Sequence, residues 1–342
     1  MRHLVTGGSG FLGNLIARRL CERGETVRII DLWEDMTRPP EIEYVECDVL
    51  DADGVGKAMR GIDVVHHVAG LNPVTKAGKR FWQVNAEGSR VVAEQATAVG
   101  VDAFVHMSSS AVFGRPREIP IRQETPVHPI EIYGKSKVAG ETAVREICET
   151  SGLPLVVLRP RALLGEGRLG IFKILFDWIC EGRRIYVIGN ANNRFQFLHA
   201  HDLMDAYLLA LDLQKPGTYN VGTDQFGTLR EDLGDLIEHV GSSSTVCGVP
   251  AGLTIGTLRL LDWFGLSPLA PFHYLTYHKD YYFDVEPLLA LGWKPKYSNQ
   301  LMLRDTYNWY LENREQILAD KEAYGHRTPA REKMLWLLRK IS

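Results

Sequence analysis

The sequence predicts an α/β protein in which a doubly wound parallel sheet is followed by a smaller C-terminal lobe. Three observations predict this fold class. An apolar run, HLVT, stands almost at the start and leads into glycines at positions 7, 10 and 13. Strand-like and helix-like segments then alternate to about residue 160. Beyond Arg161 the alternation gives way to clustered glycines and short mixed elements, which indicates a part built on another plan.

The elements of the first half follow from apolar periodicity and segment length. Strands are expected at residues 3–6, 27–30, 42–47, 62–70, 103–109 and 153–160. Helices are expected at residues 12–23, 51–59, 80–99 and 133–151. Strands and helices that take turns in this way are typical of a parallel sheet with helices on both faces.

The second half is less regular. Short strands are expected at residues 185–189, 194–199 and 217–222, while residues 249–317 are irregular and rich in aromatic side chains. We therefore predict a first domain at 1–165 that is rejoined by about 191–222, a second lobe made of 166–190 and 223–325, and a basic amphipathic tail at 326–342.

The opening stretch, residues 1–31, fits a dinucleotide cofactor. Gly7 allows the tight turn after the first strand, Gly10 keeps the backbone open to a pyrophosphate, and Gly13 lets the helix pack closely. The N-terminus of that helix offers free N–H groups and a partial positive charge to the phosphates. Asp31, at the end of the second strand, can accept hydrogen bonds from a ribose 2′-hydroxyl, which predicts NAD rather than NADP.

Composition excludes several classes of partner. The chain has 342 residues, is 45% hydrophobic and carries a formal net charge of −3, so no bulk field favours nucleic acid or an anionic membrane. It has no long uncharged apolar run and starts with a strand rather than a signal peptide, so a cytoplasmic protein is expected. The five cysteines are scattered, which favours reduced thiols over a metal site.

Tyr133 and Lys137 form a second chemical signal. They stand four residues apart at the start of a predicted helix, so both lie on one helix face. An ammonium group and a positively charged nicotinamide ring lower the pKa of a phenol, and such a tyrosine can take a proton from an alcohol. Upstream, Ser108, Ser109 and Ser110 close a strand, at the edge where ligands bind in a parallel sheet.

Further motifs stand at matching places along the chain: TGGSGFLG, CDVL at 47–50, HHVAG at 66–70, Asn85, MSSSAVFG and YGKSK. Together they resemble the extended short-chain dehydrogenase/reductase superfamily, also called the NAD-dependent epimerase/dehydratase family. The resemblance covers roughly residues 1–309. It implies a Rossmann domain that binds NAD, a smaller substrate-binding lobe, and a catalytic set of Ser109, Tyr133 and Lys137.

The resemblance also implies particular contacts. Asp48 and Val49 meet the adenine, and Ala69 and Gly70 line the inner ribose and phosphates. Lys137 contacts the nicotinamide ribose. The full set of cofactor-binding residues implied is Gly7, Gly10, Phe11, Leu12, Gly13, Asp31, Asp48, Val49, Ala69, Gly70, Tyr133 and Lys137. The substrate residues implied are Ser110, Arg161 and Arg194.

Three departures from the family pattern leave the substrate open. Ser110 and Ala111 stand where 4,6-dehydratases carry an Asp-Glu pair, which disfavours elimination. The segment LRPRALLGEG is similar to the 3β-hydroxysteroid dehydrogenase branch. Arg194 lies five residues before His199, whereas sugar-nucleotide members often place this arginine four residues before the histidine.

Two enzymatic hypotheses follow. A sugar-nucleotide epimerase would oxidise and re-reduce a ring hydroxyl and would use Arg194 and Arg161 on the diphosphate. A dehydrogenase or reductase of an apolar secondary alcohol would use the aromatic stretch 260–283 as a pocket wall. We favour the epimerase; a protein that keeps NAD only as a structural or sensing ligand is a third hypothesis.

Two expectations concern partners. The resemblance implies a homodimer through the long helices at 80–99 and 133–151. The tail at 326–342 combines a charge of +4 with the apolar run MLWLL, so it could contact a membrane surface or a subunit interface, although packing on its own lobe is at least as consistent with the pattern.

Overall fold

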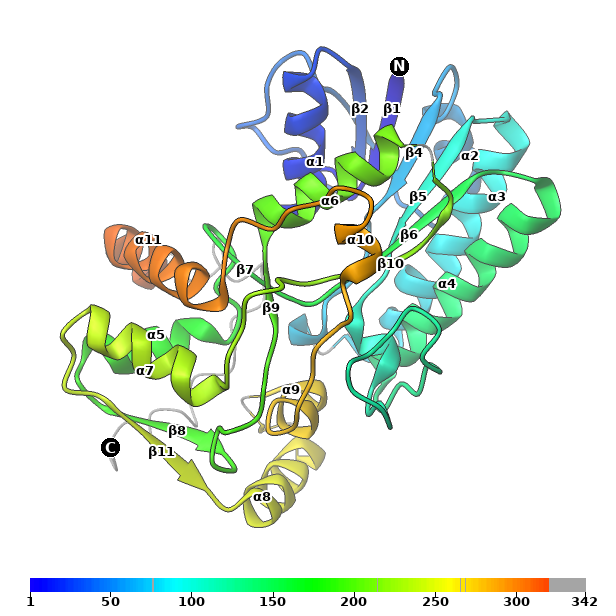
Figure 1. The fold of residues 1–342 in the computed structure, drawn as a ribbon. Helices are drawn as coiled ribbons and strands as arrows, with labels where there is room; N and C mark the ends of the chain where they lie inside the picture. The colour runs from blue at the N-terminus through cyan, green and yellow to red at the C-terminus, as the bar shows by residue number, and fades with distance from the viewer. Residues whose placement is uncertain (76, 214, 265, 268, 320–342) are drawn as a thin grey trace.

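The structure is a computed structural model that describes residues 1–75, 77–213, 215–264, 266–267 and 269–319. Its centre is a parallel seven-stranded sheet in the order β10-β6-β5-β4-β1-β2-β3 (Figure 1). The strands are β1 (Arg2–Thr6), β2 (Thr26–Asp31), β3 (Glu43–Glu46), β4 (Val64–His67), β5 (Ala103–Met107), β6 (Leu155–Pro160) and β10 (Gly217–Val221). The fold class predicted from the sequence is confirmed.

Helices cover both faces of this sheet (Figure 1). One face carries α1 (Phe11–Glu22) and α6 (Ala200–Asp212); the other carries α2 (Ala52–Ala58), α3 (Ser89–Val99) and α4 (Ile132–Ser151). Successive strand residues point to opposite faces, so Val5 joins the apolar cluster of Ile16 under α1, while Leu4 joins that of Val92 under α3. The sheet is therefore buried on both sides, as a parallel sheet requires.

A second group of elements lies beside the sheet (Figure 1). It contains α5 (Phe172–Cys180), α7 (Leu229–His239), α8 (Ala251–Trp263), α9 (Pro271–Thr276) and α11 (Asn299–Ala319), while α10 (Glu286–Leu289) lies against β10. Two small parallel sheets pair β7 (Ala162–Leu164) with β9 (Phe197–His199) and β8 (Arg184–Ile188) with β11 (Thr245–Val249). Single-turn helices lie at η1 (Pro73–Thr75) and η3 (Ser110–Phe113).

The structure differs from the sequence expectations in two places. The helix expected at 80–99 begins as a π-helix, η2 (Trp82–Gly88), before it continues as α3. The stretch 249–317, which looked irregular, forms α8 to α11, because tertiary packing rather than a clean apolar period fixes these helices. The domain boundaries and the homodimer stay predictions.

Within the described residues no helix is both long and apolar enough to cross a bilayer. The predicted amphipathic tail at 326–342 lies outside the described residues.

Candidate active site

A cavity lies at the carboxyl edge of the sheet. Its lining includes residues that directly follow six strands, among them Gly7 after β1 and Arg161 after β6. Parallel strands end at one edge, so segments far apart in the sequence meet there. The predicted residues that line it are Gly7, Gly10, Phe11, Leu12, Gly13, Asp31, Asp48, Val49, Ala69, Gly70, Ser109, Ser110, Tyr133, Lys137 and Arg161.

The three glycines of the first turn have separate roles. Gly7 has a φ of 67°, and a Cβ there would lie 2.8 Å from the Cα of Ala69. A Cβ on Gly13 would lie 2.0 Å from the carbonyl oxygen of Gly7, so only glycine lets α1 pack against the turn. A Cβ on Gly10 would meet only that same oxygen, at 3.2 Å. Gly10 therefore keeps space open on the cavity side rather than inside the protein.

These roles predict opposite results for two alanine variants. Gly13→Ala is expected to lower the free energy of unfolding by about 1–3 kcal/mol or more, because backbone must move. Gly10→Ala is expected to fold normally and to weaken NAD binding by at least about tenfold, because the methyl group occupies the phosphate side. Urea unfolding and NAD titration measure the two effects.

The control is Gly234→Ala in α7, where nothing lies within 4 Å of the added Cβ. This change should be neutral or stabilising by up to about 1 kcal/mol. Equal losses of stability in all three variants would contradict the assignment of separate roles.

The N-terminus of α1 fits an anionic group. Gly10 is its N-cap and supplies no side-chain cap, and the first turn contains no acidic residue. The first N–H groups of a helix have no partner within the helix, so they can bind phosphate oxygens. A cradle that a Cβ would fill, in front of uncapped N–H groups, fits the pyrophosphate of a dinucleotide.

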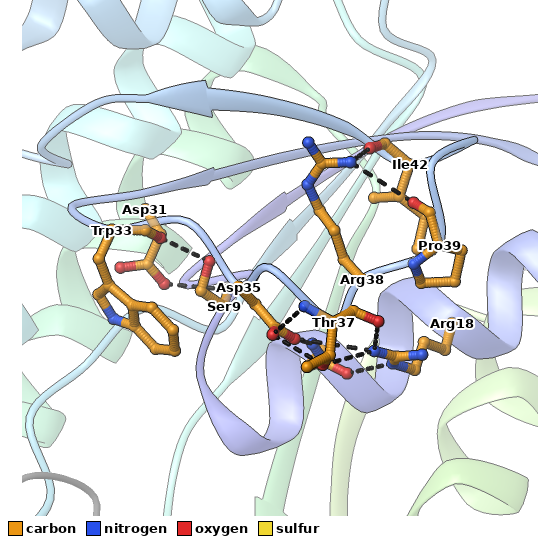
Figure 2. A network of polar contacts seen from close by, with 10 residues as sticks. Ser9, Arg18, Asp31, Trp33, Asp35, Thr37, Arg38, Pro39 and Ile42 are labelled. Atoms are coloured by element: carbon orange, nitrogen blue, oxygen red, sulfur yellow. Dashed lines mark hydrogen bonds and ion pairs between the residues drawn. The ribbon is translucent and has the colours of Figure 1, made fainter. Parts of the chain in front are cut away.

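Asp31 closes β2 beside this cradle. Its carboxylate accepts hydrogen bonds from the N–H of Ser9 at 3.1 Å and of Leu32 at 2.7 Å, while Ser9 Oγ donates to the carbonyl of Trp33 (Figure 2). These bonds hold the acid in place at the cavity wall. A fixed carboxylate there suits a ribose diol and repels a 2′-phosphate.

Two arginines of the same region are bound to protein acceptors. Arg18 donates to the carbonyl of Thr37 at 2.7 Å and to Asn14 at 2.6 Å, and Arg38 donates to the carbonyl of Ile42 at 2.7 Å. Figure 2 shows Arg38 with Pro39 and Ile42 at one end of this network and Asp31 with Trp33 at the other. Both guanidinium groups stabilise the loop after β2, which leaves Asp31 to set the charge next to the ribose position.

The adenine and ribose positions are also ordered by local bonds. Asp48 accepts a hydrogen bond from the N–H of Leu50 at 3.0 Å, and Val49 is buried. After β4, Thr6 Oγ1 accepts from the N–H groups of Val68 and Ala69, both at 3.1 Å. This hydroxyl binds the turn that carries Ala69 to the end of β1, so the two cofactor-facing turns form one rigid edge.

Tyr133 stands in the first turn of α4, at the other end of the cavity. The helix is capped by Glu131, whose carboxylate accepts from the N–H of Tyr133 and of Gly134, both at 2.7 Å. The phenol ring packs edge-on against Phe81, with ring centres 5.8 Å apart. The cap and the ring contact together fix the direction of the Tyr133 hydroxyl.

The electrostatics of this tyrosine differ from the expectation. Burial raises the pKa of Tyr133, Glu131 raises it further, and a hydrogen bond with Ser109 and the charge of Arg168 lower it in part. Lys137 was expected to lower this pKa, but its Nζ donates to the carbonyl of Met107 at 2.7 Å. Burial lowers the pKa of Lys137 to about 8. Among the residues that the structure describes, Arg168 is therefore the cation that acts on the phenol.

Asn85 connects the two sides of the cavity. It lies in the π-helix η2, where its amide accepts from the N–H of Leu71 at 2.8 Å and donates to the carbonyl of Leu71 at 3.2 Å and to Ser136 Oγ at 3.1 Å. A π-helical turn is a recurrent feature of functional sites. Here it places one amide between the loop after β4 and the helix that carries Tyr133.

The three serines after β5 have different partners. Ser108 Oγ donates to the buried carboxylate of Glu141 at 2.7 Å. Ser109 caps η3 by accepting a hydrogen bond from the N–H of Ala111. Its hydroxyl also interacts with the Tyr133 phenol, and this hydrogen bond lowers the pKa of Tyr133 in part. Ser110 accepts from Arg161 at 3.4 Å. Ser109 is thus the serine that lies next to the phenol.

Arg194 is not brought to the cavity. Its N–H donates to Asp280 at 2.8 Å, and its guanidinium lies 4.8 Å from the rings of both Phe226 and Tyr282. The side chain is exposed and does not line the cavity. The cause is the register noted above: Phe195, one residue later, points into the core instead. The position of Arg194 therefore does not support the predicted contact with the substrate.

Arg168 is a cavity residue that the sequence reasoning missed. It lines the cavity, and its guanidinium lies 5.8 Å from the centre of the Phe11 ring. Burial lowers the pKa of Arg168, and Tyr133 and Tyr277 raise it in part. The glycines that flank it at 165, 167 and 170 were noted in the sequence, but only the folded loop shows that they turn this arginine toward Tyr133.

The aromatic stretch 260–283 divides between two environments. Phe272, His273 and Tyr277 line the cavity, as the apolar-pocket hypothesis expects. Trp263 and Phe264 are 85% and 67% exposed and lie at the end of α8. The stretch therefore contributes one wall of the cavity, not an enclosed apolar pocket.

Comparisons with known proteins identify the family of this chain. The model of the "NAD dependent epimerase/dehydratase family" matches residues 3–222. The Sinorhizobium fredii protein y4nG is 40% identical over 336 residues, covering 98% of this chain and 85% of that one. A 3 beta-hydroxysteroid dehydrogenase/Delta 5-->4-isomerase of Mycobacterium tuberculosis is 26% identical and covers 96% and 95%.

The fold also matches solved structures. A crystal structure of UDP-glucuronic acid 4-epimerase from Bacillus cereus, in complex with NAD, superposes with a TM-score of 0.73. The match covers 91% of this chain and 99% of that one at 20% sequence identity, so it establishes a shared fold.

Proposed function

Because this chain belongs to the NAD-dependent epimerase/dehydratase family, we propose that it is an NAD-dependent enzyme that epimerises a sugar nucleotide at a secondary hydroxyl. The observation that carries this proposal is the charge of the cavity. Among its described lining residues, the acid Asp31 ends β2 and the acid Asp48 follows β3, whereas Arg161 contacts Ser110 and Arg168 acts on Tyr133. Cations at the reacting end suit an anionic substrate.

The catalytic roles follow from the positions of three side chains. Tyr133 holds its hydroxyl beside Ser109, so the two can share the oxygen of a substrate alcohol and Tyr133 can take its proton. Lys137, next to Gly70, positions the nicotinamide ribose. NAD, when bound, supplies the hydride acceptor and donor. After the keto sugar turns over, return of the hydride to the other face of the carbonyl carbon and of the proton from Tyr133 to its oxygen would complete an epimerisation.

A dehydrogenase of an apolar alcohol is the second candidate. Phe272 and Tyr277 in the lining, the LRPRALLGEG segment and the mycobacterial relative favour it. Against it stands the cost of bringing apolar surface against charged guanidinium groups.

Retention of the cofactor tests the proposal. We expect near-stoichiometric NAD to survive extensive dialysis of protein purified without added cofactor, because an epimerase is redox-neutral and need not exchange NAD in each cycle. Denaturation and assay of the released nucleotide measure it, and UDP-, GDP- and dTDP-sugars are then tested as substrates. If the protein loses its NAD on dialysis and then reduces added NAD to NADH with apolar alcohols, this result would support the dehydrogenase instead.

A further inference from the structure

Arg161 is a buried cation that has no carboxylate within ion-pair distance among the described residues. Its side chain is 2% exposed. Nε donates to the carbonyl of Gln196 at 3.1 Å, and Nη1 donates to Ser110 Oγ at a long 3.4 Å. Nη2 is buried and has no hydrogen-bond partner there. A guanidinium has five N–H donors, so part of its donor fork is unmet.

Arg159, two residues earlier, is also buried but does have a carboxylate partner. Glu141 accepts from its Nη2 at 2.5 Å and from its Nε at 3.1 Å. A buried charge is costly unless it is paired and hydrogen-bonded. The fold meets this requirement at Arg159 and leaves it open at Arg161, which is the pattern expected of a group that a ligand completes.

Three aromatic rings hold the Arg161 guanidinium. Their centres lie 4.3 Å away for Tyr281, 4.7 Å for Phe195 and 5.6 Å for Phe283. Ring faces attract a cation but give no acceptor along the edge where its N–H groups lie. The rings therefore fix the position of the charge without replacing a carboxylate.

The location of Arg161 specifies which part of a substrate it can reach. It borders the cavity and contacts Ser110, the neighbour of Ser109, which is bonded with Tyr133. A group bound by Arg161 thus lies close to the hydroxyl that Tyr133 acts on. The diphosphate of a sugar nucleotide is separated from that hydroxyl by the sugar ring, so an anion on the ring itself fits better.

We propose that Arg161 binds a carboxylate carried by the sugar ring on which Tyr133 acts, so that the preferred substrate is a nucleoside diphosphate uronic acid. Arg168, which also lines the cavity and acts on Tyr133, supplies a second positive charge. This inference rests on the proposed function, because it specifies the sugar of the sugar nucleotide. A planar fork that meets two carboxylate oxygens also gives geometric selectivity over a hydroxymethyl group.

A matched pair of ligands tests the inference. UDP-glucuronate and UDP-glucose share one diphosphate and differ at the ring substituent. The NAD-loaded wild type is expected to bind UDP-glucuronate at least about tenfold more tightly, as measured by titration calorimetry. In Arg161→Gln this preference should vanish through weaker uronate binding, while UDP-glucose binding stays within about threefold of the wild type.

Two further variants separate binding from folding. Arg161→Gln should melt at or above the wild-type temperature, because an unpaired buried charge is removed, whereas Arg159→Gln should melt lower because Glu141 loses a partner. Arg161→Lys keeps the charge without the fork and should retain part of the preference. Arg304→Gln, whose ion pair with Asp235 lies outside the cavity lining, is the matched control and should bind as the wild type does.

The remaining outcomes overturn one proposal or the other. If Arg161→Gln lowers the affinity for UDP-glucuronate and for UDP-glucose equally, the arginine binds the diphosphate and the carboxylate proposal is overturned. Equal wild-type affinities would also overturn it and leave the epimerase proposal standing. If the wild type binds neither of these ligands and no GDP- or dTDP-sugar, the proposed function fails. Short hydroxy acids and matched alcohols then test Arg161 alone: an acid preference lost in Arg161→Gln upholds its role, and no preference refutes it.

Discussion

Replacing Tyr133 with phenylalanine is expected to lower turnover by about 10²- to 10⁴-fold or more and to leave NAD binding unchanged. The change removes the hydroxyl that is bonded with Ser109 and keeps the ring that packs on Phe81. The other tyrosine of the described lining is Tyr277, which is the C-cap residue of α9. Turnover of the substrate found for the wild type and titration with NAD measure the two quantities.

The matched control is Tyr219→Phe. The Tyr219 hydroxyl donates to the carbonyl of Lys215, and this residue of β10 does not line the cavity. Its loss should leave turnover unchanged. Full activity in Tyr133→Phe would refute the assignment of Tyr133 as the acid–base group, and loss of NAD binding would show that the phenol acts on the cofactor site instead.

Acidification is expected to destabilise the protein steeply between pH 6.5 and pH 5. Four histidines are buried in or beside the sheet: His3, His66, His67 and His106. His3 and His66 are hydrogen-bonded to each other at 2.9 Å, and His67 is bonded to Thr6 and Ser89. His106 is stacked on His67 at 5.5 Å, and neither of its ring nitrogens has a partner within the described chain.

The sign follows from where each histidine binds its proton. Burial lowers the pKa of all four in the folded state, to about 3 for His67, while the unfolded chain takes up protons near pH 6.5. The unfolded state therefore gains protons first, and stability falls from pH 6.5 until the folded pKa is reached. For His67 alone the loss at pH 5 is about 2 kcal/mol. Several such losses together are comparable to the whole stability of about 5–15 kcal/mol.

Carboxyl groups whose pKa is raised by burial act in the opposite direction: these are Glu131, Asp202, Asp305 and, with the clearest shift, Asp232. Burial raises the pKa of Asp232 to about 6, so the folded state binds this proton more readily and gains stability as the pH falls through that value. The four histidines outweigh these carboxyl groups. Urea unfolding at pH 7.5, 6.5 and 5.5 measures the net slope.

The variant His106→Phe measures the contribution of one histidine to the pH dependence of the free energy of unfolding. Phenylalanine keeps a ring in the stack and removes a titrating group, so the loss of stability between pH 7.5 and pH 5.5 should shrink by about 1 kcal/mol. His239→Asn, which removes an exposed imidazole in α7, is the matched control. An unchanged slope in His106→Phe would exclude this histidine as a source of acid instability.

The sequence predicted those features of the site that depend on local order. The glycines at 7, 10 and 13, Asp31 and the Tyr133–Lys137 spacing each lie within one turn or at one strand end, so the chain itself sets their geometry. Features that depend on packing between distant segments could not be read in this way. Arg161 has no carboxylate partner within the described part of the chain, and Arg168 acts on Tyr133; both features arise only when the loops after β5, β6 and β7 meet.

Register and packing account for two of the corrections, those at Arg194 and in residues 249–317. A shift of one residue carries a side chain to the other face of a strand, and this places Phe195 in the core and Arg194 on the surface. In residues 249–317, helices α8 to α11 pack in different directions, so no single apolar period marks them. The exposed Trp263 adds to this effect, because an apolar residue on the outer side of a helix disguises its period.

The interleaving of the two sheets determines how this chain could be dissected or recombined. β8 pairs with β11, yet α6 and β10, which belong to the large sheet, lie between them in the sequence. A fragment that ends near residue 165 would thus lack β10 and α6, one of the two helices that cover one face. Likewise, a chimaera that exchanges specificity with a relative must transplant residues 184–188 and 245–249 together. Evolution of new substrates on this scaffold is therefore easier by point changes in the cavity than by fusion of a foreign module.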